Sequence, residues 1–341
     1  MAKKKRRTVY SGIGGQAVLE GVMMKNRGEY ATAVRRPDGD IQVNVSTLDY
    51  DPKSLIRRIP FVRGIVAFID SLKLGMNTLS WSAEFYDDEE EEENGKKSLL
   101  EKLFGDKAED VVMGLTVFIS IIFAVALFML LPWGVSELLR KRVSSESLIL
   151  LTEGGIRIAV FIIYVASIAL MKDIRRLYMY HGAEHKCINC VEQGRALTVR
   201  NVMRSSRFHK RCGTSFMLFV VLLGVILCFF IRTEILWMRV VIRLALIPVI
   251  AGISYELLQL AGKRDSIILS IISAPGLWMQ RITTREPDEE MVEVAIASVE
   301  AVFDWRAFRE KHFERSELAE TVDMTAAAAE IAAMEAEENR E

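Results

Sequence analysis

Long apolar runs separated by strongly polar segments dominate the middle of this chain. Residues Val111–Ser136 contain no charged side chain, and residues Gly213–Ile231 contain none either. An α-helix rises about 1.5 Å per residue, so about 20 apolar residues cross the roughly 30 Å hydrocarbon layer of a membrane. Both runs therefore predict transmembrane helices.

Two further segments fit the same pattern with interruptions. Residues 154–171 carry a single charge, Arg157, near one end, where a long side chain reaches the lipid headgroups. Residues 235–258 are apolar apart from two arginines one helical turn apart and a glutamate near the far end. Charge inside a membrane is costly and usually faces a protein interior, so these residues are of interest: Arg239, Arg243 and Glu256.

The distribution of lysine and arginine predicts the orientation of these helices. The segment 172–211 carries ten Lys and Arg residues, whereas the segment 135–153 carries three. Short loops rich in positive charge stay in the cytoplasm. Four crossings then place both termini in the cytoplasm as well, in agreement with the basic start at residues 3–7.

The N-terminal part predicts a small β unit followed by a helix. Ala17–Met24, Tyr30–Val34 and Ile41–Val45 have the composition of strands, and a Pro-Asp-Gly turn lies before the last of them. Residues 61–85 carry their polar side chains in one helical stripe. Such a helix lies either in the membrane interface or in the core of the β unit.

The remaining segments predict no chemistry of their own. Seven acidic residues at 87–93 indicate a solvated linker, or else a docking site for a basic partner. Residues 266–280 are apolar but contain Pro275-Gly276, which favours a re-entrant or interfacial segment. Beyond Pro287 the chain is rich in Ala and Glu, which predicts an acidic helical tail.

The predicted fold is mainly α: a polytopic membrane protein with about four transmembrane helices, a re-entrant or interfacial hairpin and a small N-terminal β unit. The expected segments are the cytoplasmic β unit and interfacial helix (10–84), an acidic linker (85–108), transmembrane helices one and two (109–173), a cytoplasmic loop (174–211), helices three and four (212–258), the re-entrant or interfacial segment (259–287) and the tail (288–341).

Charge and composition agree with this segregated organisation. The chain of 341 residues has 44 Lys and Arg against 45 Asp and Glu, a net charge of −1, and 51% hydrophobic residues. A nucleic-acid binder would need a basic excess to displace counterions from phosphates, so no nucleic-acid partner is expected. Membrane lipid is the expected partner, and oligomers or a cytoplasmic protein partner are compatible with the sequence.

The predicted cytoplasmic loop holds most of the chain's histidines and cysteines. His181, Glu184 and His185 form an H-x-x-E-H pattern. Residues four apart share one face of a helix, so both imidazoles can bind one metal ion while the glutamate acts as a general base. Glu256, at the cytoplasmic end of the fourth crossing, is either a distant third ligand or the partner of a nearby lysine or arginine.

A second pattern overlaps the first and points to a different site. Cys187-x-x-Cys190 followed by His209-x-x-Cys212 has the spacing of a four-ligand structural zinc site. Four protein ligands close the coordination shell, whereas two histidines and one further ligand leave a place for water. A third interpretation is that the histidines cap or hydrogen-bond within a polar loop, while the thiols stay reduced in the cytoplasm and are inert.

Several motifs resemble those of a known family. They are G-G-Q-A-V-L-E-G-V-M-M (14–24), H-G-A-E-H-K (181–186), R-C-G-T-S-F (211–216), S-Y-E (254–256) and P-G-L-W-M-Q (275–280). In order and over about residues 10–288, they are similar to the YqhQ family, domain of unknown function 1385. The resemblance implies an integral membrane protein of the bacterial inner membrane, sometimes labelled metal-dependent, and it favours the His-centred site over the four-ligand site.

The sequence thus supports three functional hypotheses. The first is a zinc-dependent hydrolase of a membrane-associated peptide or lipid, with His181 and His185 as ligands, Glu184 as general base, and Glu256, His209 or Cys212 completing the shell. The second is a non-catalytic assembly or biogenesis factor that holds cytoplasmic partners at the membrane. The third is a transporter that uses the arginines and the glutamate of the fourth crossing.

Overall fold

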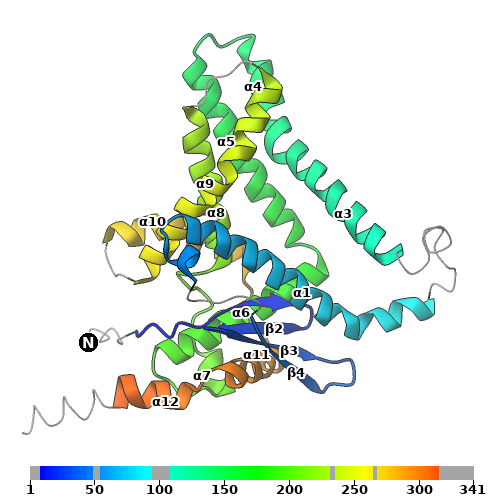
Figure 1. Cartoon of the computed structure of the whole chain (residues 1–341), viewed down its shortest axis with the longest axis vertical. Helices are drawn as coiled ribbons and strands as arrows, with labels where there is room; N and C mark the ends of the chain where they lie inside the picture. Colours follow the sequence, from blue (N-terminus) through cyan, green and yellow to red (C-terminus); the bar gives the residue numbers. More distant parts are fainter. Residues whose placement is uncertain (1–7, 49–53, 94–107, 231–234, 264–266, 315–341) are drawn as a thin grey trace, which may run out of the picture.

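The computed structural model describes residues 8–48, 54–93, 108–230, 235–263 and 267–314. The chain is mainly helical with a small N-terminal antiparallel sheet, as the sequence predicts. Figure 1 shows two parts stacked along the long axis: a group of long helices at one end, and the sheet with its covering helices at the other.

The sheet is a four-stranded antiparallel meander in the order β1-β2-β3-β4. Its strands are β1 (Gly14–Val18), β2 (Gly21–Asn26), β3 (Glu29–Arg35) and β4 (Ile41–Thr47). The predicted single strand Ala17–Met24 is wrong, because the chain reverses at Glu20, whose φ is 47°. Apolar residues lie on both sides of this tight turn, which hides the reversal in the sequence.

Helices from three distant parts of the chain cover the two faces of this sheet. Helix α1 (Val62–Glu93) packs on the face that carries Val18, Met23 and Val34. Helices α6 (Lys172–Glu192) and α11 (Glu289–Val302) pack on the opposite face, which carries Val22, Met24, Ala31 and Ala33. The β unit is therefore the centre of a three-layer core, and both faces need helices from later in the chain.

The long apolar helices form the other part of the molecule. They are α3 (Ala108–Val125), α4 (Leu131–Arg140), α5 (Glu146–Ile168), α8 (Gly213–Phe229) and α9 (Leu236–Lys263), with a π-helical turn (Ala126–Leu130) joining α3 to α4. Three stretches are long and apolar enough to cross a membrane: Gly114–Arg140, Glu146–Ile168 and Val240–Leu260. Helix α8 is equally apolar but has 17 residues, and the predicted run ended at residue 231, outside the described part.

Two glutamates of these helices bind arginines, whereas the side chain of Arg239 lies outside the described residues. Glu153 on α5 accepts hydrogen bonds from Arg157 at 3.0 Å and from Arg243 on α9. Glu256, near the other end of α9, instead binds Arg63 of α1, with 2.7 Å between its carboxylate and the guanidinium Nε. The transporter hypothesis places the charged residues of the fourth crossing along one ion path. In the structure, Arg243 and Glu256 have different partners and do not form one cluster.

Two segments differ from the expectations drawn from the pattern. The expected loop 174–211 consists largely of α6, with a short helix α7 (Val199–Met203) after it. Helix α10 (Ile267–Thr283) continues through Pro275-Gly276. A Cβ at Gly276 would lie 2.6 Å from Ser215 Oγ, so this glycine lets α10 approach α8 closely.

The first part of the expected acidic tail is a core helix. Asp288 caps α11 by accepting a hydrogen bond of 2.8 Å from Met291 N, and the apolar face of α11 is buried against the sheet. A short helix α12 (Trp305–Arg309) and a π-helical turn (Glu310–Glu314) follow. The last part of the predicted tail, 315–341, and most of the predicted linker, 94–107, lie outside the described residues.

Candidate metal centre

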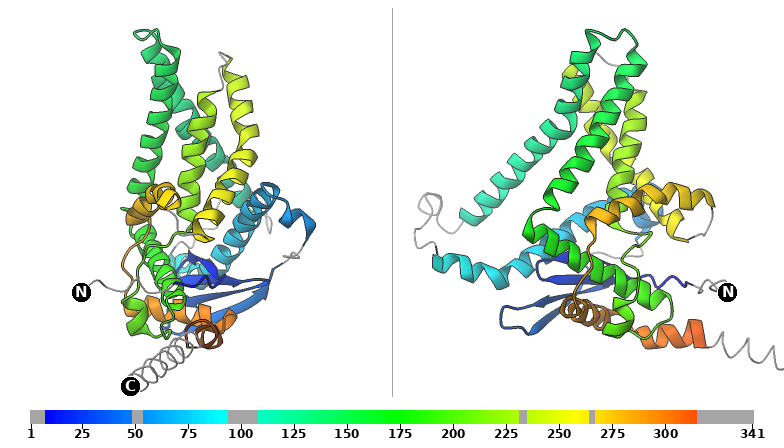
Figure 2. Two further views of the ribbon diagram at one scale, coloured as in Figure 1. Left: turned by 90° about the vertical axis from the view of Figure 1, so that its left-hand side faces the viewer. Right: turned by 180° about the vertical axis from the view of Figure 1, so that it is seen from behind.

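The H-x-x-E-H motif lies on α6, as its spacing predicts, and α6 lies between the long helices and α11 (Figure 2). The apolar positions of α6, including Ala183, Cys187 and Ile188, belong to the core beneath it. Two polar side chains of α6 are buried as well: His185 is 1% exposed and Glu184 is 4% exposed. Buried polar groups of this kind need specific partners.

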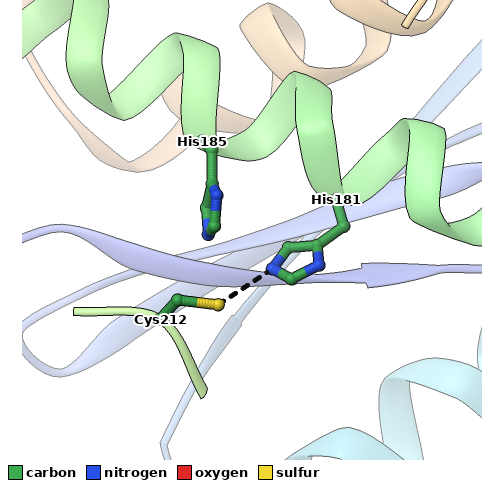
Figure 3. Close-up of side chains that lie close together, drawn as sticks. All are labelled: His181, His185 and Cys212. Carbon is green, nitrogen blue, oxygen red and sulfur yellow. Dashed lines mark hydrogen bonds between the residues drawn. The ribbon is translucent and has the colours of Figure 1, made fainter. Parts of the chain in front are cut away.

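Two histidines of α6 meet a cysteine from another part of the chain. Ligand atoms of His181, His185 and Cys212 all lie within 4.8 Å of one another. Cys212 Sγ lies 3.2 Å from His181 Nε2, and the two imidazole centroids are 4.4 Å apart. Figure 3 shows both rings pointing from α6 toward the thiol.

Cys212 reaches this position because it is the N-cap of α8. Its sulfur accepts a hydrogen bond from Thr214 N at 3.4 Å, so it takes the place that Ser or Thr usually fills at a helix start. Thr214 Oγ1 also lies 3.0 Å from the sulfur. The R-C-G-T motif therefore sets where the apolar helix begins and where the thiol lies.

Backbone carbonyl groups hold both imidazoles in one orientation. Nδ1 of His181 lies 2.8 Å from Thr283 O, and Nδ1 of His185 lies 2.6 Å from Arg207 O. A carbonyl oxygen only accepts hydrogen bonds, so Nδ1 is the protonated nitrogen in each ring. Nε2 then keeps its lone pair when the ring is neutral, which is the arrangement found around metal-binding histidines.

The electrostatics of the thiol and its neighbour are coupled. Burial by itself raises the pKa of Cys212, but the imidazoles of His181 and His185 outweigh burial and lower this pKa well below its usual value. Burial lowers the pKa of His181, whereas the adjacent sulfur raises it, with a net result of about 9. Without a metal, this arrangement favours a thiolate paired with an imidazolium.

Glu184 lies beside the histidines rather than among them. Its carboxylate is 4.0 Å from His181 Nε2, and its side chain packs against Gly15 on β1, where an added Cβ would lie 3.2 Å from Glu184 Cγ. Burial raises the pKa of Glu184, and the nearby histidines offset part of this rise. A carboxylate with a raised pKa next to candidate ligands is suited to accept and return a proton.

His209 lies next to this group but has other partners. Its ring centroid is 5.6 Å from that of His185, while its Nε2 is 3.6 Å from Glu192 and 3.3 Å from Arg211. Burial raises the pKa of Glu192, but the hydrogen bond from His209 and the charge of Arg211 lower it to about 2. Gln280 holds the His209 backbone through bonds of 2.9 and 2.7 Å.

The other sequence candidates are not brought to this place. Glu256 binds Arg63, as described above. Cys187 is buried in the core, and Cys190 donates to Ala196 O at 3.5 Å. Burial raises the pKa of both thiols, which keeps them protonated. Within the ranges that the structure describes, the His181, His185 and Cys212 group is the one with metal-binding spacing.

A cavity of about 320 Å³ opens over the group. Its walls come from β1 and the residue before it, from α6, and from the segment 209–214 that leads into α8. Sequence reasoning missed the wall formed by β1 and the roles of Gly15, Thr283 and Arg207, because backbone groups carry no residue-specific signal. The glycine-rich motif at 14–24 was the available indication.

Comparisons with known proteins place the chain in a family. The model for "Protein of unknown function (DUF1385)" matches residues 59–305, so the family region extends through α11, beyond the expected limit near residue 288. The chain is also similar to "Uncharacterized protein YqhQ" of Bacillus subtilis (strain 168), with 39% identity over 306 residues that cover 88% of this chain and 94% of that protein. No solved structure matches it. The chain therefore belongs to the YqhQ family, the proteins that share the DUF1385 domain.

Proposed function

We propose that the chain is a zinc-dependent hydrolase of the bacterial inner membrane, acting on a membrane-associated peptide or lipid at the cytoplasmic face. The observation that carries the proposal is the meeting of two oriented imidazoles and a thiol beside a buried carboxylate, at one cavity. Each of these groups has a distinct part in hydrolysis, and the arrangement leaves an open side toward the cavity.

The path of the chain supports four crossings with both termini in the cytoplasm. The sheet, α6 and α11 form one core, so they lie on the same side of the membrane. The chain leaves this side and returns between β4 and α6 through α3–α4 and α5. It leaves and returns again between α6 and α11 through α8 and α9, which makes the 17-residue α8 a crossing of about 26 Å. The ten Lys and Arg residues of 172–211 agree with a cytoplasmic location.

The donor set fits Zn²⁺. Imidazole nitrogen and thiolate sulfur are ligands that zinc prefers, and three protein ligands with one open position are typical of catalytic zinc sites. His181, His185 and Cys212 would hold the ion. When bound, zinc supplies Lewis-acid polarisation of water and of a carbonyl or phosphoryl oxygen.

The side chains around the donors account for the rest of the reaction. Glu184 would take a proton from the attacking water and return it to the leaving group. Its packing against Gly15 places the carboxylate beside β1. The carbonyl groups of Thr283 and Arg207 keep both imidazoles in the tautomer that binds through Nε2. Because Cys212 caps α8, the reaction would take place where the apolar helix begins.

Cobalt substitution tests this ligand set and gives one prediction. Purified, metal-stripped protein in detergent is titrated with Co²⁺, and a thiolate-to-cobalt charge-transfer band is expected in the near ultraviolet. Cys212→Ser should abolish the band, because the hydroxyl that replaces the thiol is a poor ligand. Cys187→Ser and Cys190→Ser should keep it, because both thiols lie outside the group.

The same titration separates the open site from the closed alternative. A four-ligand site built from Cys187, Cys190, His209 and Cys212 predicts that each cysteine variant weakens the band. Such a result, or a band of full intensity in Cys212→Ser, would contradict the proposed centre.

A further inference from the structure

We infer that the substrate is an extended polypeptide that binds as an added strand along the free edge of β1. The inference rests on the proposed function, because it names the substrate class of that site. It concerns the wall of the cavity opposite the histidines, which is formed by residues 14–17.

Strand β1 is an edge strand. It pairs with β2 on one side, and among the described residues no strand pairs with its other side. An edge strand presents backbone N–H and C=O groups that a second chain can bind, and peptides commonly bind proteins by this kind of strand addition. The edge of β1 opens on the same cavity as the candidate metal ligands.

The register shows which backbone groups of β1 point outward. Arg35 N donates to Glu20 O at 2.9 Å, so Glu20 and every second residue after it direct their backbone groups toward β3. The intervening residues of β2 therefore bond β1, and their partners there are Val18, Gln16 and Gly14. Gly15 and Ala17 consequently point their N–H and C=O groups away from the sheet.

A side-chain contact relates this strand to α6. Gly15 lies against the side chain of Glu184 on α6, because a Cβ added at Gly15 would be 3.2 Å from Glu184 Cγ. The outward N–H and C=O groups of Ala17 are two residues farther along the same edge. A polypeptide bonded to Ala17 would therefore pass directly beside the proposed general base.

Glycine at this edge leaves room for another backbone. Gly14 and Gly15 are both exposed. A Cβ at Gly14 would meet no atom within 4 Å, whereas a Cβ at Gly15 would lie 2.3 Å from Met23 O, so the open space is beside Gly14. Glycine inside a strand weakens the strand and often marks a place where a ligand or backbone approaches closely. A lipid would not use alternating backbone donors and acceptors along a strand, so the arrangement favours a polypeptide over a lipid.

Proline at position 17 tests the inference with little effect on the sheet. Ala17→Pro removes the outward N–H and leaves the bonds between β1 and β2 in place, because Ala17 does not bond β2. Ala17→Ser keeps the N–H and is the matched control. Gly14→Val is a second variant, because it adds bulk in the open space beside the edge.

Fluorescence anisotropy of fluorescein-labelled β-casein, an unfolded polypeptide, measures binding to the detergent-purified chain. Zinc content and thermal unfolding are determined on the same samples. We expect Ala17→Pro and Gly14→Val to weaken casein binding roughly tenfold, since a strand hydrogen bond or the close approach is lost. Ala17→Ser should bind as the parent chain does, and all variants should retain zinc.

The possible outcomes separate this inference from the proposed function. Equal casein affinity in all folded variants would overturn the inference. The inference would also be overturned if the variants lost binding of a fluorescent phosphatidylglycerol probe but kept binding of casein, because that result would indicate a lipid substrate. Casein binding that depends on Ala17 in a chain without zinc would support the strand edge and contradict the metal centre. Stoichiometric zinc without any casein binding would leave the metal centre in place and overturn the inference.

Discussion

Glu184→Gln is expected to lower the rate of zinc-dependent hydrolysis of labelled β-casein by about 10²–10⁴-fold, the usual contribution of a general base. The amide has nearly the same shape and keeps the packing against Gly15. It cannot take a proton from water. Zinc content should stay unchanged, because Glu184 lies beside the ligand group and not within it.

A carboxylate outside the cavity provides the matched control for this experiment. Glu300 on α11 does not line the cavity, and it pairs at 3.1 Å with Arg306, both side chains being at least 40% exposed. Glu300→Gln should leave the rate within about twofold of the parent chain, because exposed ion pairs contribute little. Equal rates for Glu184→Gln and the parent chain would contradict the general-base assignment.

The second large effect concerns stability. The Glu153 carboxylate lies between Arg157 and Arg243, and the three side chains are 3%, 12% and 7% exposed. Glu153→Leu would leave two guanidinium groups buried among apolar helices without their common partner. Removing one partner of a buried ion pair costs about 3–5 kcal/mol, so we expect a strongly lowered unfolding temperature in detergent.

Glu137→Leu is the control for this second prediction. Glu137 pairs with Arg140 at 3.2 Å, but both side chains are at least one third exposed. Its loss should cost less than about 1 kcal/mol, because water screens an exposed pair. Equal unfolding temperatures for the Glu153→Leu and Glu137→Leu proteins would show that the buried cluster does not stabilise the helices.

The local pattern of apolar and polar residues predicted where helices and strands lie better than it predicted which of them are buried. The apolar runs and the helical spacing of the H-x-x-E-H motif were recognisable because both depend on residues close in sequence. The burial of α6 and α11 could not be recognised from the sequence, because each helix is polar or acidic by composition and becomes buried only against the sheet. Likewise, Pro275-Gly276 suggested a break, whereas the glycine serves close packing between α10 and α8.

The candidate site shows the same limit. Spacing placed His181 and His185 on one helical face, but the third ligand had to come from elsewhere. Three candidates were compatible with the sequence: Glu256, His209 and Cys212. Cys212 is brought in by the start of α8, and Glu256 is taken by Arg63, which the sequence analysis had not considered as its partner. Contacts between segments that are far apart in sequence decided both outcomes.

Metal analysis of the chain purified in detergent tests the central claim most directly. The account predicts close to one equivalent of zinc per chain. His181→Ala should lower the affinity for zinc by about 100-fold or more, because a ligand is lost from the group. Less than about a tenth of an equivalent of any transition metal, unchanged in His181→Ala, would contradict it.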